Sequence, residues 1–135
     1  MLQRVQTIWL LLAATAALLT LKFPIYSGQQ ENGVFGELNG QSDFVLIVLT
    51  IAVSLLAVVC IFLYKNRSKQ SLLTLGALAL QVLQLILLYA KTAKYTQGNY
   101  SLTAIIYLLI PVFFVLAWLG IRKDEKLVRS MDRLR

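Results

Sequence analysis

The chain has 135 residues, of which 59% are hydrophobic and 14% charged, and its formal net charge is +7. Because soluble domains carry roughly a quarter charged residues, this composition excludes an ordinary soluble protein and indicates an integral membrane protein. The basic residues flank apolar stretches, which favours anionic lipid headgroups over nucleic acid as their partner.

Rare residue types exclude several kinds of site. The chain contains no histidine and a single cysteine, Cys60. It therefore lacks a bis-imidazole haem site, a histidine and cysteine cluster for zinc, and the cysteine pair of quinone-linked disulfide chemistry. We expect no cofactor, no metal and no catalytic residue, so the protein is not predicted to be an enzyme.

Four apolar stretches have the length of membrane-spanning helices, which need roughly 17 to 25 residues. They cover residues 5–23, 44–64, 71–91 and 101–120. We interpret the first as a helix rather than a signal peptide, because its small residues lie mid-segment and form no cleavage site. The fourth contains Pro111, which is expected to kink it. The pattern predicts an all-α, up-down four-helix transmembrane bundle that forms a single domain, residues 1–135.

The connections between these helices indicate the orientation. Residues 24–43 form an acidic outer loop, whose dipeptides Asn32-Gly33 and Asn39-Gly40 fit a short hairpin as well as a mobile solvated loop. Residues 93–100 are predicted to form a brief outer turn. Ten Lys and Arg residues lie on the side of the two termini and three on the other. Basic loops stay in the cytoplasm, so both termini are expected there.

Four polar side chains lie within the predicted spans. Gln81 and Gln84 share one face of the third span, and Thr50 and Ser54 form a small polar ridge on the second. In a tight antiparallel hairpin, the numbers of facing residues sum to roughly 135, which brings Ser54 opposite Gln81. These residues either join the helices by hydrogen bonds, worth about 0.6 kcal/mol each, or line a pocket for a polar ligand or lipid headgroup.

Residues 121–135 form a basic tail in which apolar residues recur at helical spacing. These are Leu127, Val128, Met131 and Leu134. The pattern predicts a short amphipathic cytoplasmic helix that contacts the membrane surface or another protein. Glu125 and Arg129 have the favourable i, i+4 order of an ion pair. We also expect Arg4 to pair with Asp124 or Glu125, which would join the two ends of the chain.

The two ends of the chain, MLQRVQTIWLLLA and IRKDEKLVRSMDRLR, resemble the terminal signatures of domain-of-unknown-function family 4293, small four-span inner-membrane proteins of Bacteroidota. The resemblance covers the whole length and topology, and it implies a location in a bacterial inner membrane. The family as a class has no assigned activity. The positions that the resemblance singles out are Gln3, Arg4, Gln6, Thr7, Asp124, Glu125, Lys126, Leu127, Val128, Arg129, Ser130, Asp132, Arg133 and Arg135.

These observations predict a non-catalytic accessory or scaffolding subunit that docks a larger membrane protein complex through its cytoplasmic face. The residues expected to contact a partner protein or anionic lipid are Arg4, Thr7, Asp124, Glu125, Lys126, Arg129, Asp132, Arg133 and Arg135. The alternative is a small lipid or hydrophobic-solute carrier with a cavity near Gln81, Gln84 and Pro111. A carrier requires an open cavity between the third and fourth spans, whereas a docking subunit requires a filled bundle and an accessible tail.

Overall fold

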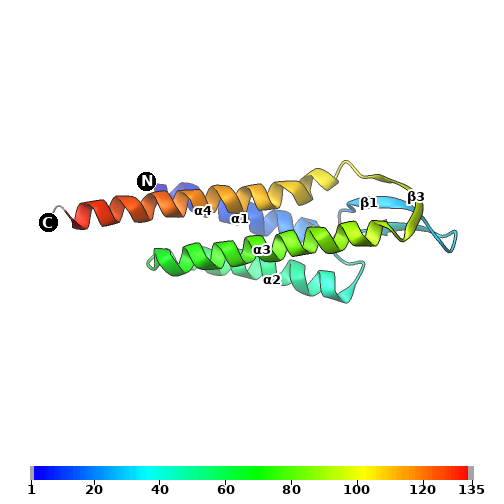
Figure 1. Cartoon of the computed structure of the whole chain (residues 1–135), viewed down its shortest axis with the longest axis horizontal. Helices are drawn as coiled ribbons and strands as arrows, with labels where there is room; N and C mark the ends of the chain where they lie inside the picture. Colours follow the sequence, from blue (N-terminus) through cyan, green and yellow to red (C-terminus); the bar gives the residue numbers. More distant parts are fainter. Residues whose placement is uncertain (1, 134–135) are drawn as a thin grey trace.

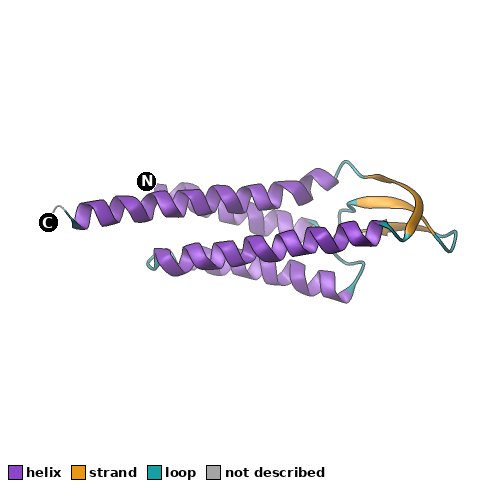
Figure 2. Ribbon diagram, in the orientation of Figure 1, coloured by secondary structure: helices purple, strands orange, loops and turns teal. Residues whose placement is uncertain are grey.

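Four helices and a small sheet make up the computed structural model, which describes residues 2–133 and the side chains from residue 5 onward (Figures 1 and 2). The helices are α1 (Leu2–Leu19), α2 (Phe44–Phe62), α3 (Arg67–Thr92) and α4 (Ala104–Asp132). They run alternately up and down, and α1 and α3 each contact both α2 and α4. The sheet lies at one end, here called the sheet end; the start of α1, the end of α4 and the α2–α3 turn lie at the other, the basic end.

An antiparallel sheet covers the sheet end, so the prediction of an all-α fold is wrong. Its strands are β1 (Tyr26–Gln30), β2 (Phe35–Leu38) and β3 (Tyr95–Tyr100), in the order β2-β1-β3. β1 and β2 form a hairpin that turns at Gly33, where φ is 75°, so the hairpin interpretation of the outer loop is confirmed. β3 occupies the segment that was predicted to be a turn, because pairing between segments distant in sequence leaves no local signal.

All four helices differ from the predicted spans at one or both ends, and α1 and α4 differ the most. α1 ends at Leu19, and the hydroxyl of Thr20 donates to the carbonyl of Ala17 (2.6 Å) as the chain turns. α4 passes through Pro111 and continues without a break into the tail, so the prediction of a separate surface helix is wrong. The helix continues because Gly120 is followed by a run of strong helix formers.

The helices carry apolar side chains on their outer faces. α2, α3 and α4 are long and apolar enough to cross a membrane, by length and composition, whereas the apolar part of α1, Val5–Leu19, is shorter. On α2, Ile51 and Leu55 are exposed while Thr50 and Ser54 are buried. Soluble bundles show the reverse pattern, whereas helices that associate in lipid use small and polar residues at their interfaces.

Small residues of α1 lie in the core of the bundle. Ala13 and Ala17 of α1 belong to the same buried cluster as Phe114 of α4, and residues of this size allow close approach of two backbones. Nearer the sheet, the hydroxyl of Tyr107 lies 2.9 Å from the carbonyl oxygen of Thr20. The alanine-rich part of α1 therefore packs within the core of the chain.

Strands β1 and β3 meet at a pair of glycines. Gly28 is the register partner of Gly98, and a Cβ atom added to Gly98 would lie 2.6 Å from a ring carbon of Tyr26. The Tyr26 ring also makes edge contacts with Tyr95 and Tyr100, with ring centroids 5.3 and 5.1 Å apart. The aromatic packing on β3 thus depends on the absence of a side chain at residue 98.

We expect Gly98→Ala to lower the free energy of unfolding by about 1–3 kcal/mol, because the added methyl group overpacks the two strands. Gly76→Ala is the matched control, since a Cβ atom there meets no heavy atom within 4 Å. Thermal unfolding of the purified protein in detergent would measure both. Equal melting temperatures of the two variants would contradict the close strand packing.

An ion pair joins the start of α2 to the end of α3. The Nζ atom of Lys91 lies 2.5 Å from Oδ2 of Asp43. The hydrogen bond and the charge of Lys91 lower the pKa of Asp43 below its ordinary value of 3.8. Because the pKa is depressed in the folded state, the pair stabilises the fold above about pH 4, and this stabilisation is lost as the pH falls through the folded-state pKa.

Asp43→Asn is expected to lower the melting temperature slightly at pH 7, because it removes an ion pair that is partly open to solvent. Asparagine retains a good N-cap side chain, so the substitution isolates the charge. As the pH is lowered from 7 through the folded-state pKa of Asp43, the melting temperatures of the variant and the wild type should converge. A difference between the two proteins that stays constant over this range would rule out the ion pair as its source.

Candidate functional site

Polar side chains inside the bundle join α2 to α3. Nε2 of Gln84 donates to Oγ1 of Thr50 (2.7 Å), and Oγ1 of Thr50 donates to the carbonyl of Leu46 (2.7 Å). The pairing of residues 50 and 84 agrees with the hairpin register predicted from the sequence. Both side chains are buried, so this hydrogen bond joins the two helices away from competing water.

Gln81, one turn before Gln84, is fully buried, yet its amide makes no hydrogen bond to any described residue. Ser54 is buried on α2, but no hydrogen bond joins it to Gln81 among the described side chains. An unpaired buried amide costs free energy because it loses its hydrogen bonds to water without replacement. Gln84 therefore stabilises the helix pair, whereas Gln81 does not.

The two glutamines should respond oppositely to replacement by leucine. We expect Gln84→Leu to lower the free energy of unfolding by about 0.6–1.7 kcal/mol, because the hydrogen bond to Thr50 is lost. Gln81→Leu should raise it by about 1–3 kcal/mol, because an unsatisfied amide is removed. Thermal unfolding of the two variants, which share the same substitution, makes the comparison. A loss of stability in Gln81→Leu would indicate that the Gln81 amide has a polar partner in the membrane.

A second polar contact closes the α2–α3 hairpin near the basic end. Nε2 of Gln70 donates to the carbonyl of Cys60 (2.9 Å), and the hydroxyl of Thr74 donates to the carbonyl of Gln70 (2.8 Å). The carbonyls of the last turn of a helix lack partners within the helix. A polar side chain just after the α2–α3 turn, such as Gln70, is therefore expected to donate to one of these carbonyls, and this signal in the sequence was overlooked.

One stripe of α4 runs from the bundle onto its free end. Positions buried inside the bundle alternate in steps of three and four: Tyr107, Ile110, Phe114, Ala117, Ile121 and Asp124. Val128 and Met131 continue this spacing, but they are 38% and 63% exposed. Figure 1 shows that α4 extends beyond the start of α1 and beyond the α2–α3 turn. Its core-facing stripe therefore extends past the ends of the other described helices.

The point where α4 leaves the bundle is held from two sides. From α3, Nη1 of Arg67 donates to the backbone carbonyl of Asp124 (3.0 Å). From α1, Gln6 packs so closely that a Cβ atom at Gly120 would lie 2.9 Å from its Cγ atom. The direction of the projecting segment, residues 125–132, is thus set by the bundle.

The predicted contact residues lie in different surroundings. Asp124 is buried, with 5% of its surface exposed, while Thr7 is exposed on α1. Glu125 pairs with Arg129 at 2.8 Å, which confirms the predicted i, i+4 contact. The exposed members of the set on the projecting segment and its cap are Lys126, Arg129, Asp132 and Arg133. The side chains of Arg4 and Arg135 lie outside the described part of the chain, so the pairing of Arg4 stays a prediction.

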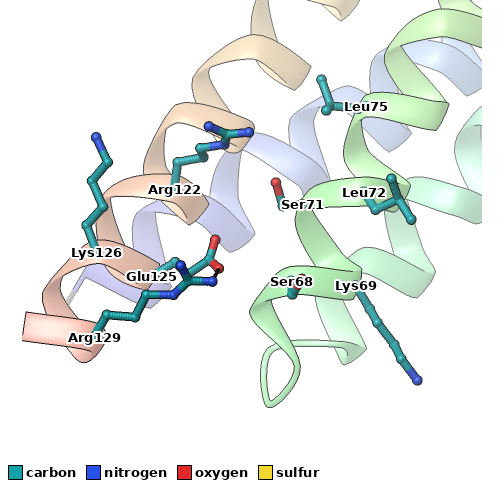
Figure 3. Close-up of a pocket in the computed structure, with 9 residues that line it drawn as sticks. All are labelled: Ser68, Lys69, Ser71, Leu72, Leu75, Arg122, Glu125, Lys126 and Arg129. Carbon is teal, nitrogen blue, oxygen red and sulfur yellow. Dashed lines mark hydrogen bonds and ion pairs between the residues drawn. The ribbon is translucent and has the colours of Figure 1, made fainter. Parts of the chain in front are cut away.

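A groove between α3 and α4 at the basic end was missed by the sequence analysis, which treated the tail without a neighbouring helix. It has a volume of about 460 Å³. Figure 3 shows the residues that line it, which are Ser68, Lys69, Ser71, Leu72, Leu75, Arg122, Glu125, Lys126 and Arg129. Cations, hydroxyls and apolar side chains therefore share one surface. Among the described residues, no group of three acidic or cysteine side chains could hold a metal ion.

Comparison with known proteins yields one match. The family model described as Domain of unknown function (DUF4293) matches residues 2–134. No curated protein and no solved structure matches the chain. The match includes all but the first and last residues of the two terminal segments on which the resemblance was based.

Proposed function

The chain belongs to the family described as Domain of unknown function (DUF4293), and we propose that it is a non-catalytic accessory or scaffolding subunit of an assembly in a bacterial inner membrane. The observation that carries the proposal is the stripe of α4, in which Val128 and Met131 continue the spacing of the buried positions past the other described helices. An apolar helix face of this kind is completed by another helix.

In this proposal all four helices cross the membrane, and the basic end lies in the cytoplasm. The charge distribution supports this orientation: ten basic residues lie in the segments of the basic end, against Lys22, Lys91 and Lys94 in those of the sheet end. The projecting segment of α4 is then accessible from the cytoplasm. The positive charge also favours contact with an anionic leaflet.

The partner is a protein helix with an apolar seam and acidic flanks. The apolar seam would pack on Val128 and Met131, in the manner of a coiled coil. Acidic flanks would complement Lys126, Arg129 and Arg133, which are exposed on the same segment. Because the bundle already holds α4 at the point where the helix leaves it, the projecting segment loses little conformational entropy on binding.

The interior of the bundle favours docking over the alternative of a lipid or solute carrier. Gln81 and Gln84, around which a carrier cavity was expected, are 0% and 1% exposed. The groove between α3 and α4 opens at the basic end, and another, lined by Lys91 and Lys94, lies beside the sheet. Neither is lined by Pro111 or by the two glutamines.

We expect the double variant Val128→Ser, Met131→Ser to recover about tenfold less partner than the wild type on purification from its native membrane in mild detergent. Losing two apolar side chains from a helix seam is expected to cost more than about 1.4 kcal/mol of binding free energy, which is a factor of about ten. The amount of partner per mole of protein, determined by quantitative mass spectrometry, is the measurement.

Ser130→Ala is the matched control, because it changes an exposed residue of the same helical turn whose hydroxyl bonds only the carbonyl of Leu127 among the described residues. It should recover as much partner as the wild type. The double variant Arg129→Glu, Arg133→Glu should also reduce the recovery of partner, because its negative charges repel an acidic helix. Equal recovery in the wild type and in the Val128 and Met131 variant, or repeated isolation of the protein alone, would count against the proposal.

A further inference from the structure

The groove between α3 and α4 combines a polar rim with an apolar wall. Ser68 and Ser71 lie in the first turns of α3, and Leu72 and Leu75 follow toward the middle of the bundle. The two leucines are 71% and 37% exposed, on the outer surface that the apolar helices present. The groove is thus open both to the basic end and to the apolar side of the bundle.

Cations predominate in this groove. Four basic residues, Lys69, Arg122, Lys126 and Arg129, line it against one carboxylate, Glu125. The carboxylate is engaged by Arg129 at 2.8 Å. In Figure 3, Lys69 and Lys126 point outward, while the guanidinium of Arg122 points from α4 toward α3.

Arg122 is held in place by its own helix. Its guanidinium carbon lies 4.7 Å from the centre of the Trp118 ring, a cation–π contact. The contact fixes the side chain while its N–H groups stay available to an acceptor. A planar guanidinium binds a phosphate through two parallel hydrogen bonds.

A serine hydroxyl faces this cation. Ser71 is only 8% exposed, and in Figure 3 its hydroxyl points from α3 into the groove, toward α4. No described residue makes a hydrogen bond with this hydroxyl, unlike the hydroxyl of Thr74 one turn later, which bonds the carbonyl of Gln70. Ser71 and Arg122 therefore offer an anion a donor from each of the two helices.

We propose that this groove is a binding site for an anionic phospholipid. The phosphate lies between Arg122 and Ser71, and an acyl chain follows Leu72 and Leu75. Glu125 accepts a hydrogen bond from a hydroxyl of the headgroup, which makes phosphatidylglycerol the lipid that fits best. The phosphate position between Arg122 and Ser71 involves neither Val128 nor Met131, so the site stands whether or not the projecting segment binds a protein.

The test uses the full chain, delipidated in detergent, with phosphatidylglycerol added in increasing amounts and the melting temperature as the readout. Phosphatidylglycerol should raise the melting temperature of the wild type. In Arg122→Gln and in Ser71→Ala, the lipid concentration for half of this effect should rise by about tenfold, because each loses a hydrogen bond to a charged group. Ser71→Ala is a small change that keeps the helix, so it remains informative if Arg122→Gln folds poorly.

The control variant is Lys123→Gln, which removes the same charge from the next residue of α4, outside the groove. Its half-effect concentration should change by less than about twofold; attraction by the whole surface would predict about fivefold for either basic residue. Inorganic phosphate at equal concentration should have no effect, and phosphatidylethanolamine with the same acyl chains a weaker one. Equal losses in the Arg122 and Lys123 variants, or equal effects of either alternative ligand, would overturn the proposal.

Discussion

The structure depends on helices that bury small and polar residues where they meet, while many of their large apolar side chains lie on the outer surface. In an apolar solvent the hydrophobic effect does not drive helices together, so close backbone packing and hydrogen bonds must. Ala13 and Ala17 provide the first on α1, and the hydrogen bond from Gln84 to Thr50 provides the second between α2 and α3. The unpaired amide of Gln81 is an exception in this interior, as are Nε2 of Gln6 and Nε1 of Trp118 among the described residues.

This arrangement also shapes the basic end. The inward stripe of α4 is satisfied by α1 and α3 as far as Asp124, and then the same helix continues without them. Helix α4 therefore contributes to two surfaces. One is the exposed continuation of its stripe at Val128 and Met131, and the other is the groove that Arg122 shares with the first turns of α3. We propose that Val128 and Met131 bind a protein helix and that the groove binds an anionic lipid; Lys126 and Arg129 border both surfaces.

The errors of the sequence analysis share a physical cause. β3 pairs with a strand that precedes it by two helices, and its alternation is too short to predict a strand alone. The tail was separated from the fourth span because its composition changes at Gly120, yet backbone hydrogen bonding in a helix does not depend on whether its side chains are apolar or charged. The groove was missed because its two walls come from different helices.

The sequence by itself determined that three helices are long and apolar enough to cross a membrane, the approximate positions of the helices, the register of residues 50 and 84, and the Glu125–Arg129 pair. Each depends on neighbours along the chain or on the shortest hairpin. Only the tertiary structure decided the three-stranded sheet, the burial of Asp124, the unpartnered end of α4 and the groove beside Arg122. These features depend on where one helix ends relative to another, which no periodicity within a single segment encodes.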